Sequence, residues 1–256
     1  MSLLSLLAVL ALASTGCTRK GSATSTSMSV HFIDVGQGDA ILIDCGTTEV
    51  LIDGGGSNSN VISYLNNYVD GPLEVVVATH PHADHIGGLI NVLESFNVEE
   101  VWKNGEESTS QTYTIFNNVI NSKAGTIRQL LRGETLDVAT TSSYLDLAFS
   151  VLNPSDTLAK NVNNNSVVLE FTYGDTKFLF EGDAEQEAEA SMIVAGVLSD
   201  IDILKIGHHG SRTASSSPFL AAATPEVAIY MAGTGNTYGH PHTKTLTVVS
   251  VIGATI

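Results

Sequence analysis

Three histidines and an aspartate follow closely on an apolar segment, and this grouping limits the fold more than any other feature of the sequence. The segment 73–78 is almost wholly apolar and predicts a buried strand. The polar residues that follow are His80, His82, Asp84 and His85. Neutral imidazole and ionised carboxylate are ligands that divalent metals such as Zn²⁺ accept. A single tetrahedral site has four ligands, and here four lie at one strand end before any distant ligand is added. The motif therefore predicts two metals side by side.

A purely structural role is the usual explanation for an isolated histidine near a strand end. It is disfavoured here, because crowded imidazoles repel one another when protonated and contribute little packing. Pro81 fixes the backbone between two of the histidines. Gly87 and Gly88 permit close backbone approach where a helix is expected to begin. The metal-binding interpretation therefore takes precedence.

The composition is that of a folded and strongly acidic protein. The chain has 256 residues, of which 43% are hydrophobic, which suffices for one large or two small domains and excludes global disorder. Asp and Glu number 27 against 11 Lys and Arg, which gives a formal net charge of −16. Such a field repels nucleic acid at long range, but bound dications reverse the sign locally, so a phosphate substrate is compatible with it.

The first residues resemble a bacterial export signal of the lipoprotein type. Residues 1–12 are apolar, and small residues lead from there to Cys17, so we expect a signal over 1–17 and a lipid-bearing Cys17. Residues 18–28 are expected to form a flexible tether. The protein is then exported, either anchored to a membrane by that lipid or released outside the cytoplasm. With Cys17 acylated, Cys45 is the single remaining thiol and no internal disulfide can form.

The remaining residues, 29–256, are expected to form one domain of two packed sheets with helices outside, because strands come in two batches that are each followed by helices. The expected strands are 30–35, 40–45, 49–53, 73–78, 98–102, 126–138, 144–152, 167–173, 177–180, 202–206 and 225–231. The expected helices are 57–70, one that begins at Asp84 or His85, 113–124, 185–197 and 243–252.

Further polar clusters also come directly after expected strands, where loops at one rim of a sandwich commonly build a site. Asp53 precedes three glycines, and Asp183 follows the strand 177–180. His208 and His209 come after the strand 202–206, and two later histidines, His240 and His242, follow the strand 225–231.

This ordered series resembles the metallo-β-lactamase superfamily, and more closely its ComEC-like branch, named for the hydrolase domain of a DNA-uptake protein. The residues that carry the resemblance are Phe32–Ala40, Leu51–Gly55, Thr79–Gly88, Phe178–Ala184, Lys205–Ser211 and Tyr238–His242. The resemblance implies an α/β fold, namely an αββα sandwich, and a dinuclear metal site. Relatives usually continue with a further strand beyond the helix expected at 243–252. The domain is therefore either complete or truncated at its C-terminus.

The resemblance also implies roles for individual residues. His80 and His82 would hold the first metal, Asp84 and His85 would hold the second, and Asp183 would bridge both. One of His208 and His209 would close the second site, and His209 is favoured. Asp53 would orient a ligand histidine rather than bind a metal.

The chain differs from many members of the superfamily at one position expected to bind the first metal. Many members place another histidine between the opening motif and Asp183, whereas the run Asn163–Ser166 stands there in this chain, as in the ComEC-like branch. Asparagine is a poor zinc ligand, so the first site is expected to be looser and completed by water or substrate, with Asn165 close to it. Two zinc ions are expected, with manganese as the alternative.

The resemblance implies hydrolysis of a phosphodiester in a phosphate-containing substrate, with DNA as one candidate. Asp84 belongs to the catalytic centre, and His240 would protonate the leaving group or bind phosphate. Ser211, His208 and His242 would lie near the substrate. Two alternatives remain open: hydrolysis of another ester or amide, such as a phosphorylcholine ester, and a surface lipoprotein that binds without catalysis.

Overall fold

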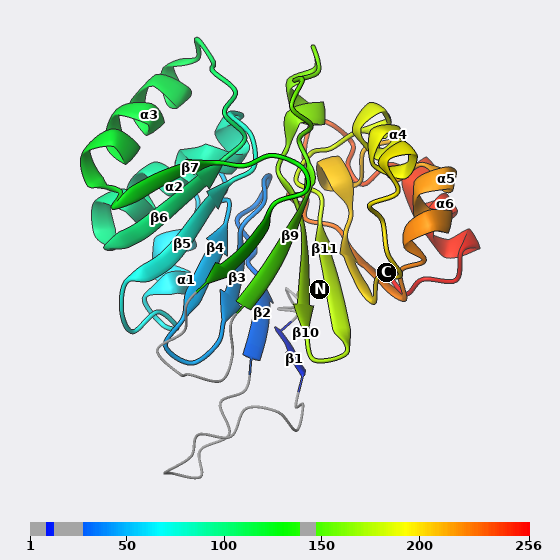
Figure 1. The fold of residues 1–256 in the computed structure, drawn as a ribbon, viewed down its shortest axis with the longest axis horizontal. Helices are drawn as coiled ribbons and strands as arrows, with labels where there is room; N and C mark the ends of the chain where they lie inside the picture. Colours follow the sequence, from blue (N-terminus) through cyan, green and yellow to red (C-terminus); the bar gives the residue numbers. More distant parts are fainter. Residues whose placement is uncertain (1–8, 13–27, 139–146) are drawn as a thin grey trace.

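Two β-sheets pack face to face, and helices cover the outer face of each sheet (Figure 1). The computed structural model describes residues 9–12, 28–138 and 147–256. The order of layers is helix, sheet, sheet, helix, so the predicted α/β architecture, an αββα sandwich, is confirmed. Among the described helices, none combines the length and apolar character that crossing a membrane requires.

Within the described part of the chain, the first sheet contains seven strands in sequential order. They are β1 (Val9–Leu12), β2 (Met28–Phe32), β3 (Ile41–Asp44), β4 (Glu49–Ile52), β5 (Leu73–Ala78), β6 (Val98–Lys103) and β7 (Thr126–Gln129). Strands β1 to β4 pair antiparallel, and β4 to β7 pair parallel. Parallel neighbours need crossover connections, and these carry α1 (Val61–Leu65), α2 (Ala83–Ser95) and α3 (Gln111–Lys123).

The second sheet contains six strands among the described residues. They are β8 (Thr135–Val138), β9 (Leu147–Asn153), β10 (Val168–Tyr173), β11 (Thr176–Phe180), β12 (Ile203–Lys205) and β13 (Val227–Ile229). Strands β11 to β13 run parallel. The helices α4 (Gln186–Ala195), α5 (Ser217–Ala223) and α6 (Thr243–Val251) accompany this sheet, and η1 (Val162–Asn165) and η2 (Gly207–Gly210) are short 3₁₀ turns.

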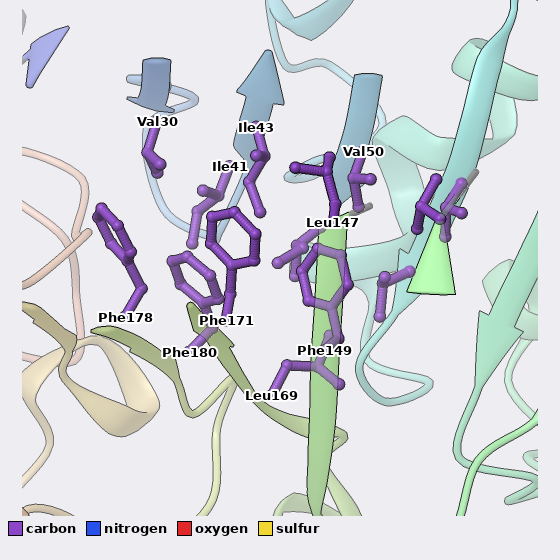
Figure 2. Close-up of a cluster of buried hydrophobic side chains, with 14 of the residues drawn as sticks. Val30, Ile41, Ile43, Val50, Leu147, Phe149, Leu169, Phe171, Phe178 and Phe180 are labelled. Carbon is purple, nitrogen blue, oxygen red and sulfur yellow. The ribbon is translucent and has the colours of Figure 1, made fainter. Parts of the chain in front are cut away.

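The central core fills the space between the two sheets (Figure 2). Alternate residues of one strand serve opposite faces, so Ile41 and Ile43 point into the central core while Leu42 packs toward the helices. Both faces of each sheet are covered, which explains why the strands read as continuous apolar runs. Phe149 and Phe171 of the second sheet stack with ring centroids 4.9 Å apart. This packing holds the strand ends that carry the polar clusters in a fixed relation.

Three sequence expectations about elements are changed by the structure. The helix expected at 57–70 is limited to Val61–Leu65. The single strand expected at 126–138 is two strands, because the chain turns at Gly133, with φ of 92°, and passes from the first sheet to the second. No helix or strand was expected between the strands 144–152 and 167–173, and the structure has the turn η1 there.

The N-terminal expectations fall largely outside the described residues. Of the signal expected over 1–17, the described part is Val9–Leu12, whose backbone pairs antiparallel with β2. Of the tether expected over 18–28, the described part is Met28, which begins β2. Cys17 also lies outside the described residues, whereas Cys45 is buried directly after β3, as expected.

Helix α2 is tied to the end of β4 by glycines on both sides. The Gly54 N–H donates to the His85 carbonyl at 2.9 Å, and the Gly88 N–H donates to the Gly55 carbonyl at 2.8 Å. A Cβ at Gly88 would overlap the Gly54 carbonyl, so the close approach requires glycine. The expected role of Gly87 and Gly88 is confirmed, and the contact sets the histidine motif beside Asp53.

Glu49 is a buried carboxyl on the helix-facing side of the first sheet. Both of its oxygens are buried without a hydrogen-bond partner in the described part of the chain. Burial, followed by the negative charges of Glu74, Asp44 and Asp70, raises the pKa of Glu49 to about 8. The folded protein therefore keeps a proton on Glu49 that the unfolded chain releases near its ordinary pKa of 4.5. Stability is lost as pH rises from that ordinary value through the folded pKa.

Replacing Glu49 by Gln should remove this loss. Denaturant unfolding at pH 5 should give similar free energies for both proteins. At pH 9 the variant should be more stable by roughly a few kcal/mol, because each unit by which the folded pKa is raised costs the ionised wild type about 1.4 kcal/mol and the Gln amide stays neutral. The exposed Glu226 supplies the matched control, and Glu226→Gln should follow the wild type at every pH. Parallel pH curves for wild type and Glu49→Gln would contradict the assignment.

Candidate metal centre

The polar clusters of the sequence converge where strands of both sheets end. Asp53 follows β4 and the histidine motif follows β5 in the first sheet, while Asp183 follows β11 and the histidine pair follows β12 in the second. They border a cavity of about 350 Å³. Its lining is Gln37, His82, Ala83, Asp84, Asp183, His208, His209, Tyr238 and His240.

The Asp183 carboxylate lies at the middle of the cluster, and each of its oxygens faces a different pair of imidazoles. Oδ1 lies 3.2 Å from His85 Nε2 and 3.4 Å from His209 Nε2. Oδ2 lies 3.7 Å from His80 Nε2 and 3.8 Å from His208 Nε2. The cluster therefore has two sides that share one carboxylate.

Two further residues complete the two sides. On the Oδ2 side, His82 Nδ1 lies 3.0 Å from His80 Nε2. On the Oδ1 side, Asp84 Oδ2 lies 3.5 Å from His209 Nε2. His80 and His82 thus lie near Oδ2 of Asp183 together with His208, while Asp84, His85 and His209 lie near Oδ1. The two sides adjoin, since the ligand atoms of His80, His85 and Asp183 also lie within 4.8 Å of one another.

The Oδ1 side contains buried atoms without hydrogen-bond partners among the described residues. These atoms are His85 Nε2, His209 Nε2 and Asp183 Oδ1. Buried polar groups are rarely left unpaired in folded proteins. Two imidazole nitrogens and a carboxylate oxygen are also the donor set that a divalent metal accepts. The ligand atoms of Asp84, His85 and His209 all lie within 4.8 Å of one another, so this side fits a metal ion.

Asp53 orients the imidazole of His85 from behind. Its Oδ2 accepts a hydrogen bond from His85 Nδ1 at 2.7 Å, which directs Nε2 toward Asp183. The same carboxylate accepts from the backbone N–H and the hydroxyl of Thr79, at 2.9 and 2.7 Å. Asp53 itself has a φ of 57°, an unusual conformation that brings its side chain under the histidine motif.

The pair His208–His209 diverges from a strained turn. Both residues adopt left-handed conformations, with φ of 47° and 55°, which costs of order 1–3 kcal/mol each. The turn is held by hydrogen bonds from His208 N–H to the Gly182 carbonyl and from Ser211 N–H to the His208 carbonyl. As a result both rings face Asp183, although from different sides. Such strain is characteristic of functional sites.

A carboxylate also stands behind each ring of this pair. His208 Nδ1 donates to Glu185 Oε1 at 2.9 Å, and His209 Nδ1 lies 3.1 Å from Asp39 Oδ1. His208 is the more exposed of the two and borders the cavity. With Asp53 behind His85, three imidazoles that face Asp183 are each backed by a carboxylate.

The cluster has a strong internal electrostatic coupling. Burial would raise the pKa of Asp183, but His209 and His85 hold it well below its ordinary value. Burial would lower the pKa of His209, but Asp183 and Asp39 raise it to about 9. Burial and the neighbouring His85 lower the pKa of His80 well below its ordinary value. The Asp183 carboxylate is thus held in its ionised form by the imidazoles of His209 and His85.

His240 lies at the rim of the centre. Its ring is 5.4 Å from that of His208 and stacks on Tyr238 at 5.6 Å. Burial, and then the neighbouring His208, His209 and His242, lower the pKa of His240 to about 4. The ring is therefore neutral at pH 7 and can still donate one N–H to a ligand in the cavity.

Three other predicted residues make contacts away from Asp183. Asn165 bonds to Ala159 and Glu106, which anchors the loop before β10. Ser211 pairs with the Thr213 hydroxyl at 2.9 Å. His242 accepts a hydrogen bond from the Arg212 N–H at 3.0 Å and precedes helix α6. These residues shape the loops around the centre.

Sequence reasoning gave no role to Asp39, Glu185 or Lys205. Asp39 and Lys205 lay inside motifs that carried the family resemblance, and a lysine at the end of an apolar strand signals a buried partner. Glu185 had no comparable signal, because an acidic residue next to an expected helix is common at the surface. Its contact with His208 depends on the tertiary fold.

Comparisons with known proteins agree with this geometry. A family model described as the metallo-beta-lactamase superfamily matches residues 29–234. ComE operon protein 3 of Bacillus subtilis is 29% identical over 243 residues, which cover 87% of this chain and 30% of that protein. Competence protein ComA of Neisseria gonorrhoeae is 28% identical over 241 residues, which cover 91% of this chain and 31% of that protein. The chain spans about a third of the length of these relatives.

A solved structure shares the fold. Igni18, described as a novel metallo hydrolase of the archaeon Ignicoccus hospitalis, superposes with a TM-score of 0.55 at 16% identity, and the match covers 87% of this chain and 90% of that one. The fold, the order of the motifs and the match over residues 29–234 lead to one conclusion. This chain belongs to the metallo-beta-lactamase superfamily.

Proposed function

We propose that this chain is a phosphodiesterase that uses two divalent metals. The observation that carries the proposal is the division of imidazoles between the two oxygens of Asp183. A carboxylate placed in this way can bridge two cations. The carboxylates of Asp39, Asp53, Asp84 and Asp183 add attraction for cations, and among the described residues the buried ammonium group of Lys205 opposes them.

Each side of Asp183 would hold one metal. On the Oδ2 side the ligands are His80 and His82, and on the Oδ1 side they are Asp84, His85 and His209. When bound, two divalent metals act as Lewis acids and supply a water of lowered pKa as the nucleophile. The imidazole-rich donor set favours zinc, with manganese as the alternative. The Oδ1 side has more ligands and should bind its metal more tightly.

Other residues of the centre would act on the substrate. His208 and His240 border the cavity with their rings, and the neutral ring of His240 would donate its N–H to a phosphate oxygen. Asp53 and Glu185 keep His85 and His208 in the orientation that faces Asp183. The cavity is open at its rim, where Tyr238 is exposed and can contact the group attached to the phosphate.

DNA is one candidate substrate, supported by the similarity to proteins named for competence. The net charge of −16 opposes long-range attraction of DNA, so binding would depend on the metals and on short-range contacts. Export, with a lipid on Cys17, is part of the same proposal and would bring the centre to substrates outside the cytoplasm.

Replacing Asp183 by Ala should remove both metals, since both sides lose an oxygen ligand. Elemental analysis after dialysis against zinc should find about two ions per chain in the wild type and fewer than one in the variant. The exposed Asp175, in the turn between β10 and β11, provides the control Asp175→Ala, which should keep both. Two retained ions in Asp183→Ala would contradict a shared bridge.

Replacing His82 by Ala should affect only the Oδ2 side. The variant should keep one tightly bound ion, and titration against a chromophoric chelator should show the weaker site lost. Replacing His85 by Ala should instead remove the tighter site. Equal loss of both sites in the His82 variant would show that the two sides are not independent.

The reaction should be tested with several substrates side by side. Bis-p-nitrophenyl phosphate should be hydrolysed, and Asp183→Ala should lower kcat/KM by more than about 100-fold, beyond the range typical of residues outside the ligand set. Single-stranded DNA, double-stranded DNA, a phosphorylcholine ester and a chromogenic cephalosporin complete the panel. Turnover of the cephalosporin without any of the phosphodiesters, the phosphorylcholine ester included, would overturn the proposed reaction.

A further inference from the structure

A lysine that is entirely buried joins the two sheets beside the metal centre. Lys205 ends β12 of the second sheet, and its ammonium group has no solvent exposure. It donates to Asp39 Oδ2 at 2.6 Å and to the Ile206 carbonyl at 3.0 Å. Asp39 lies in the connection between β2 and β3 of the first sheet and is also buried. The ion pair therefore spans the interface of the sandwich.

The second oxygen of Asp39 is directed at the metal centre. Oδ1 lies 3.1 Å from His209 Nδ1, which also lies 3.0 Å from the Met231 carbonyl. The opposite nitrogen of the ring, Nε2, faces Asp84 and Asp183. Lys205, Asp39 and His209 thus form a continuous chain of polar contacts that ends at the Oδ1 side.

The two acceptors of His209 Nδ1 differ in charge. The Met231 carbonyl alone would fix the ring orientation and its tautomer. A carboxylate at the same nitrogen also increases the electron density on the imidazole and makes it a better metal ligand. Asp39 can have this effect only while it is ionised, which is costly for a carboxyl in the interior.

The Lys205 ammonium group supplies the counterion of this buried carboxylate. It lies 2.6 Å from Asp39 Oδ2, and Asp39 is the ion-pair partner of Lys205 among the described residues. The buried Glu181 is directed elsewhere, because its Oε2 accepts a hydrogen bond from the Gly207 N–H at 2.7 Å.

Structural stability is a weak explanation for this ion pair. The desolvation of two buried charges offsets most of their attraction, and apolar residues of similar volume often serve as well or better. A purely structural contact would also not need the second Asp39 oxygen to meet a histidine of the centre.

We propose that Asp39 and Lys205 are a positioning pair that makes His209 a strong ligand for the metal on the Oδ1 side. The proposal rests on the two-metal function proposed above. It assigns to Asp39 the same relation to His209 that Asp53 has to His85, and it assigns to Lys205 the support of Asp39.

The test compares zinc affinities of the full chain, measured by competition with a chromophoric chelator. Lys205→Met leaves Asp39 buried without a counterion and can fail to fold, so the main variant is Asp39→Asn combined with Lys205→Met, which removes both charges. Its tighter site should weaken about 10- to 100-fold, the usual effect of losing a group that supports a metal ligand. Affinity of the weaker, Oδ2 site should stay within twofold of the wild type.

Two further variants separate charge from packing. Lys205→Arg keeps the cation and should retain the tighter site better than the double variant. The control Lys177→Met removes a lysine that contacts Ser199 at the far end of the second sheet, and it should leave both affinities unchanged. Thermal unfolding of the metal-free proteins gives the stability effect separately.

The outcomes are distinct. The double variant could keep both zinc affinities and merely unfold at a lower temperature. That result would show that the pair only stabilises the fold, and it would overturn the proposal. Equal weakening of both sites would overturn it too. A wild type that binds fewer than two zinc ions would refute the proposed two-metal function, and the present inference with it.

Discussion

The Asp183 carboxylate is the group on which the rest of the centre depends. It is buried among four imidazoles, two toward each oxygen, and its negative charge is retained because His209 and His85 compensate for the loss of water. Its position is fixed by the end of β11, while the facing histidines come from the ends of β5 and β12. The sandwich must therefore be assembled before the centre exists.

A second group of carboxylates lies behind the imidazoles, on the side away from Asp183. Asp53 holds His85, Glu185 holds His208, and Asp39 meets His209. Each contact uses the nitrogen that faces away from Asp183 and leaves the other nitrogen directed inward. The strained turn at His208 and His209 lets two adjacent residues direct their rings at the same carboxylate from different sides.

Much of the fold could be predicted from the sequence. Apolar runs marked strands β2 to β6 of the first sheet, and the glycines after His85 indicated a close approach that the structure contains. The expectations failed where local pattern is ambiguous. The run 126–138 was expected to be one strand, but the turn at Gly133 and the packing of its two halves on different sheets divide it. The helix expected at 57–70 is short because most of that segment packs as turns.

The sequence by itself determined the ligand types, their order and their places at strand ends, because a strand followed by histidine or aspartate delivers that side chain to the edge of a sheet whatever its partners are. Only the tertiary structure decided which oxygen of Asp183 each imidazole faces, and that Asp39, Glu185 and Lys205 support the centre. Those contacts join residues up to 170 positions apart, such as Asp39 and His209. The packing distance between two sheets fixes them, and no local pattern encodes that distance.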